Sequence, residues 1–536
     1  MAMTKVNEIS KSIEADWHLV MPVDDLKLHS ALMKRINGRQ IALFNTQEGF
    51  RACDNRCPHE GFPLSEGSVS GKCTLTCNWH NWKFDLESGE NLLGGDRLRT
   101  YPLEERNGVL WIDLQDLPYH QRYQSIVKSL RDAYDDYSYD RVAREIARLI
   151  ILGADPLDSL RLSVSWSWPK MEYGWTHAFA GMADWLILYD ELVDDEEGQL
   201  ICLVEAVTHC SYDCLRESDY AYPKGHQSFD ETLFLHSIEI EDEKTAIACI
   251  RGGLQDGLEF SDFEPALSRA ALRHYNDFGH SIIYVTKIKS LIDRLGDEVA
   301  EGLLLSLVRG IIYASREDKI PEFRDYDNQI KTWGQSGGAK PESGLWKKKS
   351  INRSMKATVD CSDTDPEELY GYLLKANAMN LLGFDLEHQY KTHVSVSGNV
   401  GWLDFTHGIT FASAVRQQCI KFPDLWPAGL LQMACFNGRN ATFTDFESDL
   451  SEWYSKDIQK QIAGLLEKVL DHGQAEHIVS VHLLKTLLSV RDEIVYLNEE
   501  DAGCLVAAVT RFIESPLKRR QVRRTAYQSL QFVAKE

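Results

Sequence analysis

The sequence predicts an α+β protein of more than one domain, in which a small all-β domain precedes a large, mostly α-helical domain. Strand-like alternation of apolar and polar side chains runs through the first part of the chain. Past residue 120 the apolar side chains recur at helical spacing instead. A chain of 536 residues is long enough for two to four domains with a sizeable core. We therefore expect domains at residues 1–120 and 121–536.

Charge and cysteine content narrow the class of protein. A net charge of −23 repels phosphate backbones, which excludes nucleic acid as an expected partner. Twelve cysteines in so long a chain, with no signal-peptide pattern at its start, indicate a reduced, cytoplasmic protein. The longest apolar run, Gly302 to Ala314, is interrupted by Arg309, so no membrane span is expected. The basic residues Lys518 to Arg520, Arg523 and Arg524 are interpreted as a solvated helix face.

Two pairs of cysteine and histidine are the most specific feature of the chain. Cys57-Pro-His59 and Cys77-Asn-Trp-His80 form C-x-H and C-x-x-H, separated by seventeen residues. Two thiolates and two imidazoles are the ligands of a Rieske [2Fe-2S] cluster, which transfers single electrons. A mixed set of this kind also binds zinc, but C-x-H is unlike the C-x-x-C of a zinc ribbon. We expect Cys57, His59, Cys77 and His80 to hold a [2Fe-2S] cluster.

The surrounding sequence resembles a known family. From Trp17 to Ile112 it is similar to the N-terminal Rieske domain of ring-hydroxylating and related oxygenases, and Cys77 to Gly89 follows that family's C-x-x-H-x-W-x-F-[DN]-x-x-[TS]-G pattern. Respiratory Rieske proteins carry an extra disulfide between the two cluster loops, and this chain lacks the cysteines that would form it. Cys53 and Cys73 are interpreted as small buried thiols. The resemblance implies a separate ferredoxin or flavin reductase as electron donor, because no flavin or nicotinamide motif is visible.

The helical part departs from that family. The oxygenase iron motif, [DE]-x-x-H-x(4)-H, does not occur. We expect helices at 127–151, 265–315 with a break near Gly296, 365–382, 406–420, 425–434, 451–472, 477–496 and 499–514. Residues 328–353, rich in glycine, are expected to form a long loop and a possible internal boundary.

Several His and Asp residues lie on these apolar helices. The segments Asp277-x-x-His280 and Asp404-x-x-His407 resemble each other. Positions i and i+3 share a helix face, so each segment can direct a carboxylate and an imidazole at one point. The candidate ligands of a second, non-haem iron site, mono- or dinuclear, are His177, Asp184, Asp277, His280, Asp404, His407, His477 and His482. The alternative for each aspartate is a helix cap and for each histidine a hydrogen-bonded core residue.

Residues 403–440 and 475–492 faintly resemble the questin oxidase-like family, which implies oxidation of a small organic, secondary-metabolite-like substrate. The sequence thus predicts a Rieske-dependent, O₂-using oxygenase or oxidase. Two alternatives stay open. The first is an electron-transfer protein with a helical binding or scaffold domain. The second is a metal-dependent hydrolase with the cluster as a redox sensor.

Overall fold

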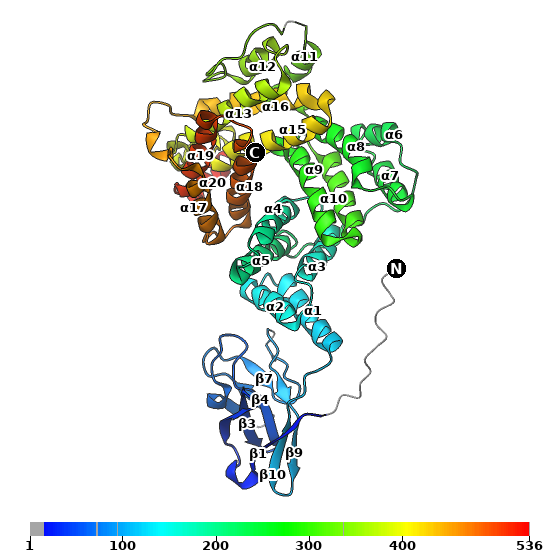
Figure 1. The fold of residues 1–536 in the computed structure, drawn as a ribbon, viewed down its shortest axis with the longest axis vertical. Helices are drawn as coiled ribbons and strands as arrows, with labels where there is room; N and C mark the ends of the chain where they lie inside the picture. The colour runs from blue at the N-terminus through cyan, green and yellow to red at the C-terminus, as the bar shows by residue number, and fades with distance from the viewer. Residues whose placement is uncertain (1–14, 71–72, 94, 336, 535–536) are drawn as a thin grey trace. The chain divides into compact units, whose positions relative to one another are not determined.

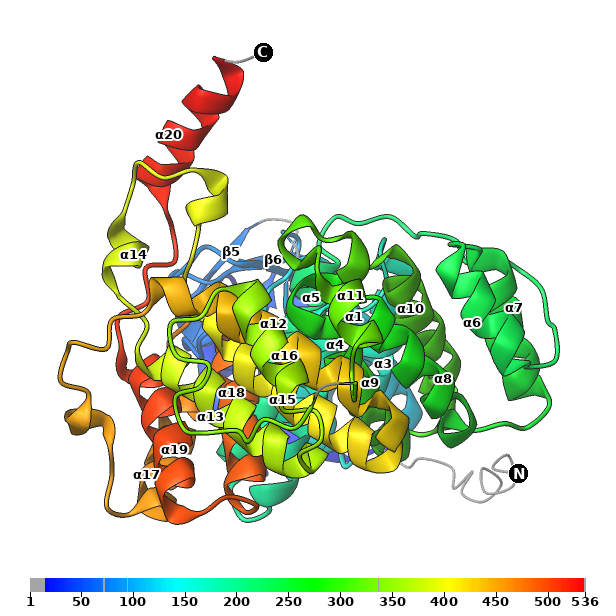
Figure 2. The same cartoon turned by 90° about the horizontal axis from the view of Figure 1, so that it is seen from above.

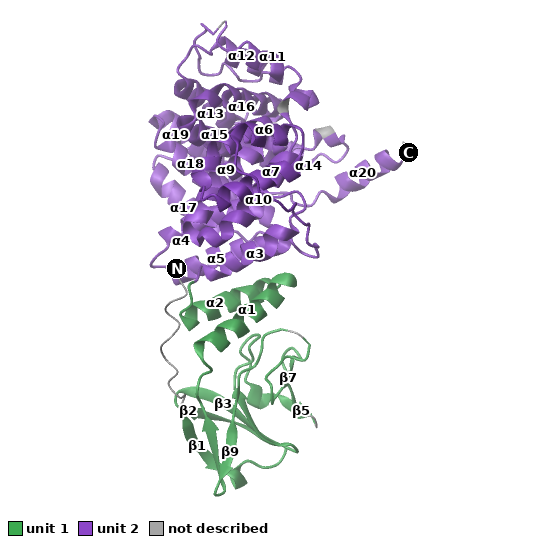
Figure 3. Ribbon diagram, turned by 90° about the vertical axis from the view of Figure 1, so that its right-hand side faces the viewer, with its two compact units in different colours: residues 1–155 green, residues 156–536 purple. Residues whose placement is uncertain are grey.

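The computed structural model describes residues 15–70, 73–93, 95–335 and 337–534 (Figure 1). The chain separates into two compact units, residues 1–155 and 156–536 (Figure 3). The predicted order of an all-β region followed by a large helical region is confirmed. Within the first unit the last strand ends at Asp113 and the first helix begins at Tyr119. Among the described residues no helix has both the length and the apolarity needed to cross a membrane.

The first unit contains three antiparallel sheets. Their strand orders are β1-β10-β9, β2-β3-β4-β8 and β5-β6-β7. The strands are β1 (Trp17–Pro22), β2 (Ala31–Ile36), β3 (Arg39–Thr46), β4 (Gly49–Asp54), β5 (Ser68–Ser70), β6 (Thr74–Thr76), β7 (Lys83–Asp85), β8 (Thr100–Tyr101), β9 (Leu103–Arg106) and β10 (Val109–Asp113). Two of the hairpins turn through Asn-Gly with positive φ at both residues, at Asn37-Gly38 and Asn107-Gly108, which is the geometry of a two-residue turn.

Strand β3 separates the two cores of this unit. Because side chains alternate across a strand, Ile41 and Leu43 pack into one core, and Ala42 and Phe44 pack into the other. The second core also contains both cysteines of the metal motif and the buried thiols Cys53 and Cys73. The cluster loops are therefore rooted in a packed core, which fixes where their tips lie.

Two helices complete the first unit, α1 (Tyr119–Asp135) and α2 (Tyr139–Leu152). The expected helical stretch 127–151 is thus a helix pair, and α2 ends at Gly153, whose φ of 80° is left-handed. The fully buried carboxylate of Asp96, in the loop after β7, joins α2 to the strands. It accepts hydrogen bonds from Arg144 Nη2 and Arg148 Nη1, both at 2.6 Å.

Apart from isolated β-bridges, the regular secondary structure of the second unit is helical in its described residues (Figure 2). Its helices of four residues or more are α3 (Asp158–Ser167), α4 (His177–Glu191), α5 (Glu196–Asp213), α6 (Glu231–Glu239), α7 (Glu243–Gln255), α8 (Phe260–Arg273), α9 (Asn276–Leu295), α10 (Ala300–Tyr313), α11 (Tyr326–Lys331), α12 (Ile351–Asp360), α13 (Pro366–Leu382), α14 (Glu387–Tyr390), α15 (Trp402–Lys421), α16 (Trp426–Asn440), α17 (Ile458–Leu470), α18 (His477–Ile494), α19 (Glu499–Glu514) and α20 (Val522–Val533).

Most of the expected helices are present, with three differences. Residues 265–315 form three helices rather than two, because the chain also breaks between α8 and α9, where it forms an isolated bridge from His274 to Arg316. The expected helix 451–472 begins only at Ile458, after the cap of Asp457. The expected loop 328–353 overlaps α11 and the start of α12, so its irregular part is shorter.

Four helices form a closed ring in the second unit. Helix α4 packs on α9, α9 on α15, α15 on α18, and α18 on α4. Helices α15 and α18 are buried on nearly every face, because each is enclosed by others, and their buried side chains include polar ones. The polar residues that point into this ring are therefore removed from bulk water, and each needs a partner.

Candidate functional site

Two loops of the first unit bring the predicted cluster ligands together. They repeat the same backbone pattern: the amide of Cys57 donates to the carbonyl of Phe62, and the amide of Cys77 donates to that of Trp82, both at 2.8 Å. Each loop then turns through a residue with positive φ, Gly61 at 76° and Asn81 at 61°. The glycine and asparagine of the sequence motif are thus explained by this turn, because they tolerate a left-handed conformation.

The four side chains lie together at the tips of these two loops. Cys57 and Cys77 are buried at the base, whereas His59 and His80 are partly exposed at the rim. The Nδ1 atoms of the two imidazoles lie 3.1 Å apart and face the same space. Burial, with the neighbouring Cys77, raises the pKa of the Cys57 thiol to about 11, so a bound cation is needed to hold Cys57 as a thiolate at neutral pH. The donor set fits one iron at the thiols and one at the imidazoles.

Aromatic and acidic residues border the imidazoles. The Trp82 ring stacks on His59 with centroids 4.3 Å apart and planes 15° apart. Exposed Trp79 lies on the outer side, with its ring 5.8 Å from that of His80. Glu60 places its carboxylate 4.0 Å from His59 Nε2 and 3.7 Å from His80 Nδ1. The rim is thus open enough for electrons to enter and leave at the histidine side.

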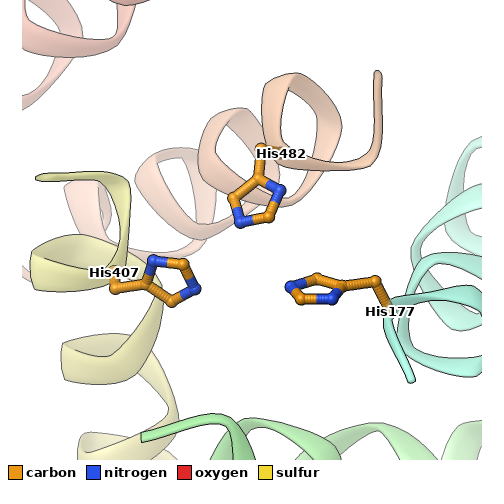
Figure 4. A group of neighbouring side chains, drawn as sticks. All are labelled: His177, His407 and His482. Atoms are coloured by element: carbon orange, nitrogen blue, oxygen red, sulfur yellow. The ribbon is translucent and has the colours of Figure 1, made fainter. Parts of the chain in front are cut away.

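A second group of histidines lies inside the four-helix ring. Each ring helix contributes one residue: His177 from α4, His280 from α9, His407 from α15 and His482 from α18. The Nε2 atom of His280 lies 2.9 Å from Nε2 of both His177 and His407. Nitrogen atoms of His177, His407 and His482 all lie within 4.8 Å of one another. Figure 4 shows the rings of these three converging on one space.

The backbone fixes which nitrogen of each imidazole faces that space. Nδ1 of His280, His407 and His482 lies 2.8, 2.7 and 2.5 Å from the carbonyl oxygen four residues earlier in its own helix. Nδ1 must therefore carry the proton and donate it to that carbonyl, which leaves Nε2 as the lone-pair nitrogen. This arrangement is typical of metal-binding histidine, where the outer nitrogen is held by a carbonyl or carboxylate.

The electrostatics also suit a cation. Burial, with the neighbouring histidines and Lys485, holds the pKa of His177, His407 and His482 well below the ordinary value, so these imidazoles are neutral. Nε2 of His482 is buried and has no hydrogen-bond partner among the described residues. Two unprotonated nitrogens of His280 and His407 at 2.9 Å repel each other unless a positive charge lies between them. A metal ion would satisfy all of these lone pairs at once.

Lys485 is a residue of this site that the sequence did not single out. It lies one turn after His482 on α18, and its Nζ is 3.3 Å from Nε2 of His407. Burial lowers the pKa of its amine to about 7. An amine whose pKa lies near neutral pH can lose its proton when a cation binds beside it, which removes the repulsion between the two charges. The sequence did offer a signal for Lys485, which stands three residues after His482 in an apolar stretch. Buried lysines are rare, so a lysine in such a stretch indicates a special role.

The other predicted ligands lie elsewhere. Asp184 pairs with Lys287 at 2.6 Å, and Asp404 accepts the Gly401 amide at 2.9 Å as a helix cap, so neither belongs to the histidine group. His477 lies in a separate buried cluster, with Nδ1 3.4 Å from Glu205. The side chain of Asp277 lies outside the described residues. Among the described residues, the structure therefore brings together the four histidines without Asp184 or Asp404.

Comparisons with known proteins identify the first unit. Residues 16–102 match the Rieske [2Fe-2S] domain family. The 4beta-methylsterol monooxygenase of Methylococcus capsulatus is 36% identical over 108 residues, 18% of this chain and 29% of that protein. The methanesulfonate monooxygenase ferredoxin subunit of Methylosulfonomonas methylovora is 36% identical over 96 residues, 18% of this chain and 77% of the subunit. Apo dicamba monooxygenase is 25% identical over 19% of this chain and 34% of that one, with a TM-score of 0.18.

The chain belongs, through its N-terminal domain, to the Rieske [2Fe-2S] proteins. Its relatives of that type include a monooxygenase, and they also include separate ferredoxins of monooxygenase systems. The match with the sterol monooxygenase spans less than a third of that protein. The family therefore supports a redox domain with a [2Fe-2S] cluster, and these matches cover that domain and not the helical unit.

Proposed function

We propose that this chain is a Rieske-dependent oxygenase or oxidase whose helical unit holds a non-haem iron ion among His177, His280, His407 and His482. The observation that carries the proposal is that four imidazoles, one from each of four helices, direct a nitrogen atom toward one buried space. One of these nitrogens, Nε2 of His482, has no protein hydrogen-bond partner among the described residues. Buried polar atoms are almost always satisfied, so this space is built for a cation.

The Rieske domain favours iron over other metals at this site. Imidazole nitrogen binds zinc, copper, iron and nickel. A cluster that transfers single electrons has a use only where a second centre accepts them, and zinc is not redox-active. Iron with open coordination positions supplies O₂ chemistry when it is bound. Residues 403–440 and 475–492, which contain His407 and His482, resemble the questin oxidase-like family. This resemblance also supports an oxidation at the histidine group.

The electron count defines the partners. Inserting one oxygen atom into a C–H bond while the other leaves as water follows RH + O₂ + 2e⁻ + 2H⁺ → ROH + H₂O. Cys57, His59, Cys77 and His80 would hold the cluster that passes these electrons singly, so it must be reduced twice in each turnover. A separate ferredoxin or flavin reductase would supply the electrons, and the partly exposed imidazoles would be its docking point.

Metal content of anaerobically purified protein tests the proposal. Wild type should contain more than two irons per chain, and a Cys57→Ser/Cys77→Ser variant should lose two of them and keep the remainder. A His407→Ala/His482→Ala variant should lose the remainder and keep the cluster. The exposed His226, changed to alanine, is the matched control and should lose neither.

Two results would redirect the assignment. Wild type with two irons and no other metal would leave an electron-transfer protein with a helical binding or scaffold domain. Zinc bound at the four histidines, with turnover that needs no reductant, would indicate a hydrolase. The second alternative is favoured by one observation, the lack of a carboxylate in the histidine group among the described residues, since three histidines also bind catalytic zinc.

A further inference from the structure

A pocket of about 360 Å³ lies where two of the metal-binding helices begin. Leu403 and Ile478, which form part of its wall, are the residues whose carbonyls hold His407 and His482. Side chains on a helix lean toward its N-terminus, so both imidazoles lean toward this end of the ring. The pocket is therefore next to the histidine group, with one layer of residues between them.

The pocket contains a buried cation without an anionic partner. Arg524 was expected on a solvated helix face, but only 5% of it is exposed. Its Nε donates to the carbonyl of Lys391 at 2.9 Å, and one terminal nitrogen donates to the carbonyl of His388 at 2.7 Å. These contacts fix α20 against the segment around α14, beside which it lies in Figures 2 and 3.

Among the described residues, the side chain of Arg524 donates to two backbone carbonyls and forms no ion pair with a carboxylate. Buried charges are normally paired, because removing an ion from water costs several kcal/mol that only a counter-charge or full hydrogen bonding offsets. The remaining terminal nitrogen of the guanidinium donates to no protein acceptor in the same part of the chain. An arginine kept in this state can donate its remaining terminal nitrogen to a carboxylate from outside the protein.

Other residues of the wall complete an anion site. Trp402 is 2% exposed, and its indole Nε1 has no hydrogen-bond partner among the described residues. Lys518 and Arg519 add positive charge, and Val400, Val479 and Leu517 add apolar surface. Of the two acids in the wall, Asp404 is used to cap the Gly401 amide and Glu476 stands at the N-cap position of α18.

We propose that this pocket binds an organic anion, whose carboxylate contacts Arg524 and the Trp402 indole while its apolar body lies against the valine and leucine side chains. Pockets of this size accept small organic molecules. The anion is a carboxylic acid that binds beside the first turns of the two helices that carry His407 and His482. Its binding does not depend on the proposed function.

Binding of 1-naphthoate to the full-length protein, measured by calorimetry with and without loaded metal, tests this site. Wild type should bind 1-naphthoate at least tenfold more tightly than the neutral 1-naphthamide. Arg524→Gln should weaken naphthoate binding at least tenfold and remove the preference over the amide. The adjacent, exposed Arg523, changed to glutamine, is the matched control and should bind as wild type does.

A second variant covers the case in which Arg524→Gln unfolds the C-terminal helix. Trp402→Phe keeps an aromatic side chain but removes the N–H donor together with the pyrrole part of the buried indole, so it should weaken naphthoate binding several-fold and also lower the melting temperature by a few degrees. Its binding is therefore measured well below that temperature, where the variant is fully folded. Naphthoate binding that neither substitution weakens, or an equal affinity for the amide, would overturn the proposal. Inorganic phosphate that competes with equal affinity would also overturn it, because the site would then select charge alone. Naphthoate binding in metal-free protein separates this test from that of the metal site.

Discussion

Replacing Asp96 by asparagine removes the charge of the carboxylate that joins helix α2 to the strands of the first unit. Asp96 is fully buried and accepts from Arg144 at 2.6 and 3.1 Å and from Arg148 at 2.6 Å. Removing one member of a buried ion pair costs about 3–5 kcal/mol, because the other charge is left unpaired. Here the arginine side chains are 28% and 34% exposed, and Arg148 keeps Glu145 as a partner. The expected cost is therefore lower, about 2–3 kcal/mol.

Asp116→Asn provides a control within the same unit. Asp116 also pairs with two arginines, Arg99 at 2.6 Å and Arg39 at 3.3 Å, but its side chain is 43% exposed. Water replaces the lost contacts at such a site, so the expected cost is below about 1 kcal/mol. The two variants differ mainly in burial, and the comparison isolates the effect of removing a charge from the interior.

Urea unfolding of the anaerobic holoprotein, followed by the visible absorption of the cluster, measures both effects in the first unit. With a slope of roughly 2 kcal/mol per molar urea, Asp96→Asn should lower the unfolding midpoint by about 1–1.5 M, and Asp116→Asn by less than about 0.5 M. Equal shifts for the two variants would refute the reasoning, because they would show that the buried contacts with α2 add nothing to the stability of the cluster domain.

Three further outcomes are expected. The arginine hydrogen bonds outweigh burial and lower the folded-state pKa of Asp96, so the midpoint difference between wild type and Asp96→Asn should be complete at pH 7 and shrink below about pH 4, where the unfolded carboxyl is protonated. Gly279→Ala places a Cβ 2.1 Å from an aromatic ring of α15 at a φ of 83°, so it should reduce both the melting temperature and metal retention. Gly257→Ala is the control, because its φ of 88° is similar but its Cβ meets open space, and it should reduce the free energy of unfolding by only about 1 kcal/mol. Arg416→Met leaves the buried Glu493 carboxylate unpaired and should destabilise the helical unit by about 3 kcal/mol in thermal melting, and an unchanged melting temperature would contradict this.

The sequence was sufficient for the cluster domain because its ligands are local. Cys57 and His59 are two residues apart, and Cys77 and His80 are three apart, so each pair occupies one turn. The glycine and asparagine in those turns are residues that adopt positive φ, which a sequence displays directly. Helix positions in the second part could likewise be predicted from apolar periodicity, although their ends moved by several residues where a cap such as Asp457 decided the start.

The histidine group could be predicted only in part. Its members are more than a hundred residues apart in the case of His177 and His280, and spacing does not reveal which helices become neighbours. Asp404 and His407 share one helix, yet the imidazole points into the ring while the carboxylate caps the helix start. Local spacing cannot distinguish a ligand from a cap, because both use the same residue types near a helix N-terminus.

The sequence by itself determined a Rieske domain, its four cluster ligands as candidates and a helical partner, because these depend on contacts between residues close in the chain. Only the tertiary structure decided that four helices close into a ring, that their histidines meet while Asp184 and Asp404 lie elsewhere, and that Lys485 and Arg524 are buried. The physical reason is that burial and long-range packing are properties of the assembled core. The same histidine or arginine is a solvated surface residue or an unsatisfied interior one according to which helices enclose it.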